Sequence, residues 1–508
     1  MKKVQPYIPG IFLFLVALVI GMLSYQEYGM SWDEPISRQV GNETYNYVFN
    51  HDPALKSLRE RIYGTAFELP LIFIEKWGHI SDSRDIYLMR HIATHIFFLV
   101  SVFCGYILIY RLFKNQFLAC LGFVMLVIAP RIYAHSFFNS KDIAFLSAAL
   151  IVFMFCQVAF EKNKAVYYML LGAACGYAAG IRIMGVMFAA FILLFLLVDM
   201  LTDIIDRKKW LKPLANIVLF LSAFCVVLLV SWPYLWDNPI RNFIQSYQGM
   251  SHFPWVGSVL FKGAFIDAAN LPWYYFPVWF VITTPPVWLI AGFAGMVLLV
   301  ISILKRPMTF ARNGTDRHFL FYLLCFMTPV LAVIFLHSVL YDDWRHLYFV
   351  YPGFVLMALY GINSLVNTRF KPVIIIACII QAGFAAYFMV GSYPFEQVYF
   401  NSFVPHSPEY LRKNYELDYW GCGYKQALER LVKVQPWGTI TINREMNPLE
   451  NNIMMLPDRD RKRMQILDHE ADYKITTFRG HPEDFPYPTV VYSVKVLNST
   501  ILCVYKTH

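Results

Sequence analysis

The sequence predicts an all-α polytopic membrane domain of about eleven transmembrane helices, followed by a small C-terminal α/β domain. Hydrophobic residues make up 58% of the 508 residues and charged residues only 15%, with a mean hydropathy of +0.47. Soluble domains have about 45–50% apolar and about 25% charged residues. The apolar residues form blocks of about 20, the length of helix that crosses a bilayer core. From about residue 392 onward the composition becomes polar, which indicates a separate domain.

Eleven apolar blocks define a transmembrane domain over residues 1–391. The first block is long for the apolar region of a signal peptide, and no small-residue cleavage site follows it, so we interpret it as a span. The blocks are expected at 9–27, 87–110, 116–133, 142–160, 165–181, 183–200, 214–233, 275–304, 318–338, 346–364 and 372–391.

The basic residues predict the orientation of these spans. Every second connection carries Lys or Arg, which is typical of cytoplasmic connections under the positive-inside rule. The net charge of +9 therefore indicates a membrane topology, and no nucleic-acid partner is expected. The pattern places the N-terminus in the cytoplasm and the C-terminal domain outside, and the short loops favour a bacterial inner membrane. The basic connections contain Arg111, Lys114, Lys162, Lys164, Arg207, Lys208, Lys209, Lys212, Lys305, Arg306, Arg312, Arg317, Arg369 and Lys371.

The opposite connections form the outer face. Outer loops are expected over 28–85, 134–141, 234–274 and 339–345. The first contains an apolar run, Phe67 to Trp77, that is too short to span and is expected in the membrane interface.

The segment 392–508 is predicted to be an extracytoplasmic α/β domain. A helix is expected over Tyr424–Val434, a strand over Thr439–Ile442, and a terminal hairpin over Val490–Val496 and Ile501–Tyr505. Two cysteines of this domain, Cys422 and Cys503, would be able to pair in an oxidising compartment.

An acidic pair, Asp33 and Glu34, lies a few residues beyond the first span and precedes Pro35. Burial against an apolar boundary and mutual repulsion would both raise a carboxyl pKa. The pair is either a solvated loop feature or a general base and anchor for a cation or sugar hydroxyl at the membrane face.

A second polar cluster precedes the fourth span and includes His135, Lys141 and Asp142. Asp142 would serve equally well as a helix N-cap. The predicted topology nevertheless places it on the same face as Asp33, and acidic and basic groups together suit a site that handles a phosphate and a hydroxyl.

Further basic residues lie at the outer ends of spans, where they either snorkel or line the same site. The donor-phosphate candidates are Lys141, Arg182, Arg345 and His346, and the additional candidates are Arg90, His135 and His252. His91 and His95 have the i,i+4 spacing of a zinc pair, but without a third ligand nearby we favour ordinary interhelical contacts.

The order of these features resembles the GT-C glycosyltransferases. The resemblance rests on the acidic pair, on Pro130 to Asp142, and on the aromatic outer loop with Leu271–Phe276 and Thr284-Pro285. It extends over essentially the whole chain. The most similar branch is glycosyltransferase family 39, with the protein O-mannosyltransferases and the aminoarabinose transferases of lipid A. The tail segments Tyr393–Asn401 and Asp418–Gly421 are similar to bacterial members that have an added extracytoplasmic domain.

The resemblance implies a polyprenyl-phosphate-linked sugar as donor and an acceptor protein, glycan or lipid on the extracytoplasmic face. It implies inversion at the anomeric carbon, with Asp33 as general base and with Glu34 and Asp142 orienting Asp33 or the acceptor. No cofactor is expected, although some GT-C enzymes use a divalent metal and His252 leaves that open here.

Two other classes of function remain as alternatives. A transporter or flippase of lipid-linked sugars would bind the same lipid without transfer chemistry, and it should show inverted repeats and charges near the bilayer midplane. No repeat is visible, and the charges gather at one face, which favours the enzyme. A structural or assembly protein would use the outer tail to dock a partner, and the acidic pair would then be incidental.

Overall fold

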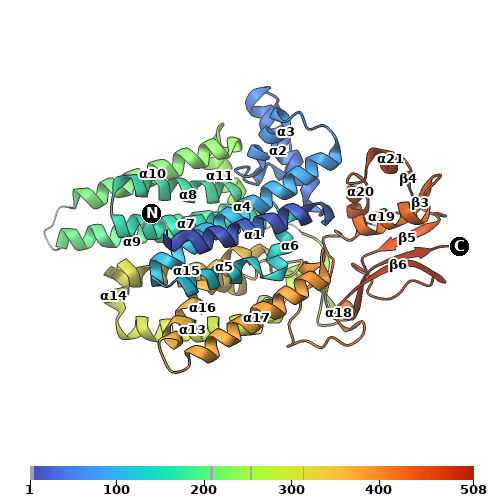
Figure 1. Ribbon diagram of the computed structural model, residues 1–508. Helices are drawn as coiled ribbons and strands as arrows, with labels where there is room; N and C mark the ends of the chain where they lie inside the picture. Colours follow the sequence, from blue (N-terminus) through green and yellow to red (C-terminus); the bar gives the residue numbers. More distant parts are fainter. Residues whose placement is uncertain (1–4, 206–209, 252–254, 313, 445) are drawn as a thin grey trace.

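The computed structural model describes residues 5–205, 210–251, 255–312, 314–444 and 446–508. A long helical bundle forms most of the molecule, and the C-terminal domain lies against one end of it (Figure 1). The all-α membrane domain and the small C-terminal domain are thus both present.

Nine helical stretches within these residues are long and apolar enough to cross a membrane, which makes the chain a multi-pass membrane protein. They are built on α1 (Ile8–Ser24), α4 (Ser83–Phe113), α7 (Asp142–Lys162), α9 (Val186–Ile205), α10 (Leu211–Ser231), α13 (Pro286–Lys305), α15 (Gly314–Phe335), α16 (Tyr351–Val366) and α17 (Lys371–Ser392).

The other two apolar blocks of the sequence have different forms. One is a pair of helices, α5 (Gln116–Val127) and α6 (Pro130–Phe138), bent by 61° at their junction. Pro130 explains the break, because a residue before proline avoids the helical region, and Ala129 has ψ 101°. The second is α8 (Ala165–Ile181), with 17 residues. The loop expected over 134–141 is therefore mostly helix, with only residues 139–141 between α6 and α7.

Close helix packing depends on small residues, as is usual between helices in a membrane. Gly172 and Gly176 of α8 face α10, where an added Cβ would lie 2.1 Å from the Phe220 carbonyl oxygen and 2.5 Å from that of Phe224. The Gly-x-x-x-Gly spacing therefore allows α8 and α10 to approach backbone to backbone.

The connection between α1 and α4 contains two helices, α2 (Asp33–Phe49) and α3 (Glu68–Trp77), that stand beside the bundle (Figure 1). The short apolar run of the sequence is thus the helix α3. Between them lie two 3-10 turns, η3 (Pro53–Lys56) and η4 (Arg59–Ile62).

A second long connection follows α10 and consists of short elements. They are η6 (Pro233–Leu235), α11 (Pro239–Ser251), the hairpin β1 (Ser258–Phe261) and β2 (Ala264–Asp267), η7 (Ala268–Asn270) and α12 (Tyr275–Thr283). Further along, α14 (Pro307–Arg312) precedes α15, and η8 (Arg345–Val350) precedes α16.

The C-terminal domain contains a five-stranded sheet in the order β4-β3-β5-β7-β6. Its strands are β3 (Ile440–Asn443), β4 (Met464–Leu467), β5 (Tyr473–Thr476), β6 (Thr489–Val496) and β7 (Ser499–Lys506). Strand β3 pairs in parallel with β4 and β5, whereas β7 is antiparallel to both β5 and β6. The helices are α18 (Tyr410–Asn414), α19 (Tyr424–Val434), α20 (Asn447–Ile453) and α21 (Asp458–Arg461).

The predicted elements of this domain are largely confirmed. Helix α19 has the expected bounds, and it packs against β5 and β7 with Leu428 and Leu431 buried. The terminal hairpin turns at Leu497 and Asn498, whose φ angles of +48° and +62° fit a two-residue turn with both central residues left-handed. All nine cysteines lie within the described residues and are free, so a Cys422–Cys503 bridge is not formed.

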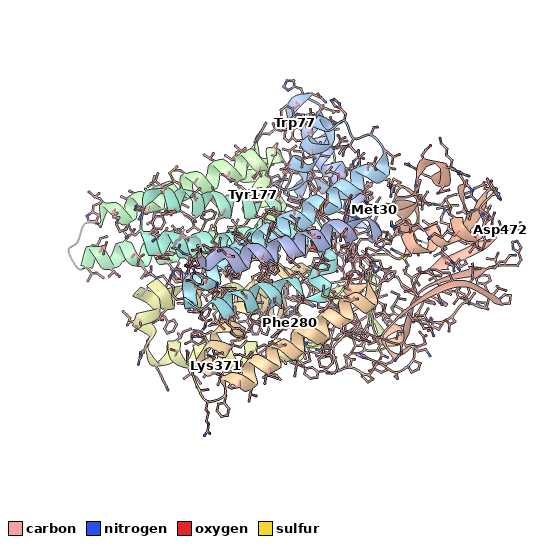
Figure 2. The ribbon with its side chains drawn as sticks, viewed as in Figure 1. Met30, Trp77, Tyr177, Phe280, Lys371 and Asp472 are labelled. Atoms are coloured by element: carbon pink, nitrogen blue, oxygen red, sulfur yellow. The ribbon has the colours of Figure 1, made fainter. Side chains whose placement is uncertain are left out.

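The C-terminal domain joins the end of the bundle where α1 leads into α2. Met30 lies at this end, whereas Lys371, in one of the basic connections, lies toward the other (Figure 2). Asn452 of α20 holds the Met30 backbone through two hydrogen bonds of 2.8 and 2.9 Å. The domain and the acidic pair thus share one end of the molecule.

Candidate active site

Asp33 is the first residue of α2 and lies where the bundle meets the C-terminal domain. Its carboxylate oxygen is 3.7 Å from Nη1 of Arg345, and 33% of its side chain is exposed. Burial tends to raise the pKa of Asp33, but the positive charges of Lys141 and Arg345 outweigh it and lower the pKa below its usual value. Asp33 is therefore an ionised carboxylate that remains accessible.

Asp142 begins α7 but does not cap it. The Asn139 side chain takes that role, since its Oδ1 accepts the Asp142 N–H at 2.9 Å. The carboxylate of Asp142 instead pairs with Arg182, and its other oxygen lies 3.3 Å from Arg345 Nη1. Asn139 Nδ2 also donates to this carboxylate at 2.8 Å. The interpretation of Asp142 as an N-cap is thus wrong. Its carboxylate instead forms ion pairs with Arg182 and Arg345.

Arg345 lies at the centre of the cluster and is 3% exposed. Its guanidinium contacts Asp33, Asp142 and, at 3.1 Å, Asp342. Its guanidinium carbon is 4.9 Å from the Tyr341 ring centroid and 4.5 Å from that of Trp420. This flat environment suits the planar guanidinium of arginine better than the compact ammonium of lysine.

Lys141 is half-buried, and its ammonium lies 4.5 Å from the centroid of the Tyr63 ring. Among the described residues no carboxylate forms an ion pair with it. It lines a pocket between α2, the segment before α3, and the α8–α9 junction, together with Ser37, Tyr63, Glu68, Ser140 and Arg182. A lysine without a carboxylate partner in a pocket is well suited to an anionic ligand.

Glu34 is buried and faces away from Asp33. The backbone N–H and the hydroxyl of Ser31 donate to its Oε2 at 2.8 and 3.2 Å, and His91 Nε2 lies 2.9 Å from its Oε1. The adjacent carboxylates therefore have separate partners. Glu34 fixes the turn that leads into α2, whereas Asp33 faces the charged cluster.

Arg90 and His135 contact the surroundings of this cluster. Arg90 forms a buried ion pair with Glu68, which also accepts a hydrogen bond from Ser140 Oγ at 2.5 Å. His135 is buried and accepts the Trp420 indole N–H at Nε2, 3.3 Å away. Arg90 thus joins α4 to α3, and His135 joins α6 to the C-terminal domain.

His346 is half-buried beside Arg345, with its ring edge-on to Tyr341 at 4.6 Å. No described residue hydrogen-bonds to its Nδ1. His252 lies outside the described residues.

The structure offers no protein cage for a metal in the part of the chain that it describes, because no three His, Cys, Asp or Glu residues converge there. His91 contacts Glu34, whereas His95 Nδ1 lies 2.7 Å from Ser136 Oγ and its ring stacks on Phe137. The two histidines make the separate interhelical contacts expected of them.

The sequence analysis missed two acidic residues beside Arg345. Asp342 bridges Arg345 at 3.1 Å and Arg479 of the C-terminal domain at 2.8 Å. Asp343 is buried, and burial raises its pKa although Arg131 lies 2.8 Å away. Both aspartates have left-handed backbones, with φ +56° and +61°, a conformation that Asp tolerates better than most residues. Their adjacency to Arg345 was a usable signal, whereas nothing in the sequence identified Arg479.

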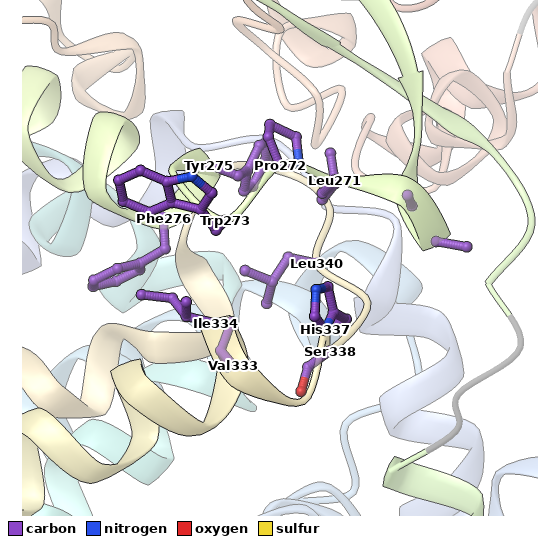
Figure 3. Close-up of a pocket in the computed structure, with 12 residues that line it drawn as sticks. Leu271, Pro272, Trp273, Tyr275, Phe276, Val333, Ile334, His337, Ser338 and Leu340 are labelled. Carbon is purple, nitrogen blue, oxygen red and sulfur yellow. The ribbon is translucent and has the colours of Figure 1, made fainter.

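A second, mostly apolar pocket lies between the 268–276 segment and the end of α15 (Figure 3). Its wall reaches Leu340, which is the neighbour of Tyr341 in the charged cluster. The labelled side chains of Trp273, Phe276, Val333, Ile334 and Leu340 surround the space (Figure 3). An apolar pocket thus adjoins the charged cluster.

Residues 87–232 match the family model described as dolichyl-phosphate-mannose-protein mannosyltransferase. The sequence matches none of the curated proteins with which it was compared. Among solved structures, ArnT from Cupriavidus metallidurans bound to undecaprenyl phosphate is similar, with a TM-score of 0.50, 13% identity, and 98% of each chain covered. ArnT in the apo state gives a TM-score of 0.49 at 11% identity, covering 98% of this chain and 97% of that one. The Archaeoglobus fulgidus oligosaccharyltransferase gives 0.48 at 10% identity, covering 90% of this chain and 64% of that one.

The fold over nearly the whole chain is therefore similar to that of ArnT. The match over residues 87–232 and this similarity of fold agree with the resemblance to GT-C glycosyltransferases that the order of the motifs predicted.

Proposed function

We propose that the protein transfers a sugar from a polyprenyl-phosphate donor to an acceptor hydroxyl at the face where the C-terminal domain lies. The observation that carries the proposal is the accessible, ionised Asp33 beside the cations Lys141 and Arg345 at the end of the bundle. The family model named for dolichyl-phosphate-mannose chemistry and the ArnT structure with undecaprenyl phosphate support the choice of donor.

The reaction is a single displacement at the anomeric carbon. The acceptor oxygen forms a bond to C1 while the bond from C1 to the phosphate oxygen breaks, so the configuration at C1 inverts. The acceptor proton passes to Asp33, and the electron pair of the broken bond leaves with the polyprenyl phosphate. A carboxylate near C1 also stabilises the positive charge that develops there.

The cations of the cluster would neutralise the departing phosphate. Lys141 and Arg345 lie near Asp33, Arg182 pairs with Asp142 beside them, and Lys141 forms no ion pair with a described residue. Charge-assisted hydrogen bonds from such groups are the strong ones in phosphate recognition. Burial and the two arginines keep the ring of His346 neutral, so it would meet the phosphate as a hydrogen-bond donor. Asp142 keeps Arg182 and Arg345 in place, and Glu34 supports the turn before Asp33.

The electrostatics of Asp33 fit a base that becomes active when the donor binds. In the free protein Lys141 and Arg345 lower its pKa, which would make it a weak base. A donor phosphate would neutralise much of this positive charge. The pKa of Asp33 would then rise towards the range in which it can accept a proton from the acceptor.

We also propose the orientation in the membrane. Lys371, in one of the basic connections, lies toward the end of the bundle away from the C-terminal domain (Figure 2). The positive-inside rule then assigns that end and the N-terminus to the cytoplasm. Transfer would take place on the extracytoplasmic face of a bacterial inner membrane, and the acceptor would be a protein, glycan or lipid exposed there.

A transfer assay tests the proposal. The protein in nanodiscs is incubated with undecaprenyl phosphate carrying labelled mannose or aminoarabinose, and with membranes of the native host as the source of acceptors. The wild type and the control Asp85→Asn, an exposed carboxylate at the start of α4, should transfer label. Asp33→Asn should reduce the rate about 10²–10⁴-fold, the usual contribution of a general base.

Two results would contradict the proposal. Transfer by Asp33→Asn at a rate near that of the wild type would remove Asp33 from the role of base. Movement of labelled donor across a liposome membrane without transfer would identify a flippase.

A further inference from the structure

The C-terminal domain contributes side chains to the charged cluster itself. Trp420 covers the guanidinium of Arg345 at 4.5 Å, and its indole N–H donates to His135 of α6. Tyr419 donates its hydroxyl proton to Asp343 at 2.8 Å. Both residues are 1% exposed, so the Asp418–Gly421 segment is inserted into the end of the bundle.

The same domain clamps the backbone that leads to Asp33. Asn452 accepts the Met30 N–H at 2.8 Å and donates to the Met30 and Gly421 carbonyl oxygens at 2.9 and 3.1 Å. Gly29 packs against the domain so closely that an added Cβ would lie 2.0 Å from the Cys422 carbonyl oxygen. The C-terminal domain therefore fixes the backbone at Met30, three residues before the proposed base Asp33.

Arg479 links the C-terminal domain to Arg345 through Asp342. It follows β5, and its Nη2 lies 2.8 Å from one oxygen of Asp342, whose other oxygen is 3.1 Å from Arg345. The Arg479 side chain also donates to the Tyr419 carbonyl oxygen and lies over the ring of Trp32, the neighbour of Asp33. Only 16% of it is exposed. Asp342 thus forms ion pairs with one arginine of each domain, Arg345 of the bundle and Arg479 of the C-terminal domain.

We propose that the C-terminal domain is a fixed part of the active centre, with Arg479 as a positioning residue that sets the place of Arg345 through Asp342. This inference rests on the proposed function. If Arg479 were removed, the full charge of Asp342 would act on Arg345. Arg345 would move towards Asp342, away from Asp33 and from the donor phosphate. The domain therefore differs from a lid, because opening it would expose Tyr419 and Trp420 and separate buried charges.

The test compares Arg479→Ala and Arg479→Lys with the control Arg430→Ala. Arg430 is an exposed arginine of the same domain that also lies over an aromatic ring, that of Tyr492. A displacement of about 1 Å at a reacting group lowers turnover by about 100-fold. We expect Arg479→Ala to lose about 10- to 100-fold in kcat, Arg479→Lys to recover part of it, and Arg430→Ala to match the wild type.

The pH profile distinguishes positioning from general loss of structure. When Arg345 retreats from Asp33, the pKa of Asp33 rises. The acid limb of kcat should then move to higher pH by about 0.7 unit, as expected for a retreat of about 1 Å from the present 3.7 Å at an effective dielectric constant of about 20. A smaller amount of folded protein would lower the amplitude without moving the limb.

A double-mutant cycle with Asp342→Asn completes the test. Because Arg479 acts through Asp342, adding Arg479→Ala to the Asp342→Asn protein should change kcat by less than about twofold, since coupled residues are not additive. An unchanged kcat in Arg479→Ala, an unmoved acid limb, or additive losses in the cycle would each overturn the inference. No transfer by the wild type would instead overturn the proposed function, and this inference with it.

Discussion

Lys141 provides the sharpest test of where the donor phosphate binds. It is half-buried in a pocket lined by Tyr63 and Arg182, and it has no ion-pair partner among the described residues. The change is Lys141→Ala, with Lys141→Arg as the variant that keeps the charge. Lys56→Ala is the control, because Lys56 also lies in the α1–α4 connection but is 51% exposed and pairs with Asp237 at 2.6 Å.

The contacts of Lys141 set the expected size of the effect. A hydrogen bond to a charged group contributes about 1.5–3 kcal/mol. Its loss should weaken the binding of a polyprenyl phosphate about 10- to 150-fold, since about 1.4 kcal/mol is tenfold in Kd. The fold should lose little, because the Lys141 side chain forms no ion pair with a described residue and lies over the Tyr63 ring, a cation–π contact of about 0.5–2 kcal/mol.

Lys141→Ala should also change the pKa of Asp33. The charge of Lys141 is the largest of the influences that lower the pKa of Asp33, so its removal should raise that pKa. The acid limb of activity should therefore move to higher pH in Lys141→Ala and stay in place in Lys56→Ala.

The measurement is a titration of the protein in nanodiscs with a short-chain, water-soluble polyprenyl phosphate, together with a melting curve of each variant. Lys141→Ala should bind weakly and melt near the wild type, and Lys141→Arg should retain much of the affinity. A Kd for Lys141→Ala within twofold of the wild type, with the fold intact, would refute the assignment of Lys141 to the phosphate.

Two further predictions concern stability. Glu68→Gln should destabilise the protein by about 3–5 kcal/mol, because it leaves Arg90 buried without its partner, whereas the apolar pair Glu68→Leu with Arg90→Met should recover most of the loss. Melting in detergent checks this, and equal losses in the single and double variants would contradict it. Glu396 is buried beside Tyr28, and burial raises its pKa to about 8. Its folded pKa is higher than its unfolded one, so its stabilising contribution is complete below about pH 4.5 and is lost as the pH rises through about 8, by at most about 5 kcal/mol. Melting temperatures between pH 5 and 9 should fall less steeply in Glu396→Gln, and parallel curves would show that Glu396 does not titrate in this range.

The span pattern was largely predictable from the sequence because hydropathy and helix length depend only on local composition. Each of the eleven apolar blocks is mainly helical in the structure, but the block expected over 275–304 is divided into α12 and α13 at Thr284 and Pro285. The bend at Ala129 and Pro130 was not predicted, although proline is a known cause of breaks. Hydropathy averages over a window, so it registers the apolar content of α5 and α6 but not the single residue that separates them.

The charged cluster was predictable in part, because topology alone brings span ends together. The alternation of basic connections placed Asp33, Asp142 and Arg345 at one face, and the structure brings all three into contact. Arg479 has no such signal. It lies in a polar domain among many charged residues, and only the way that domain seats on the bundle brings it to Asp342.

The acidic pair shows why neighbours in sequence are poor evidence for a shared site. Asp33 and Glu34 are the first two residues of α2, and consecutive residues of a helix point about 100° apart and do not face each other. Glu34 therefore turns into the protein towards Ser31 and His91, and Asp33 turns towards Arg345. Asp33 shares Arg345 with Asp142, which is distant in sequence and begins a helix of its own, and with Asp342. Because the two side chains point in different directions, the repulsion expected between adjacent carboxylates is avoided. The pKa of Asp33 is instead lowered by Lys141 and Arg345, which come from other parts of the chain.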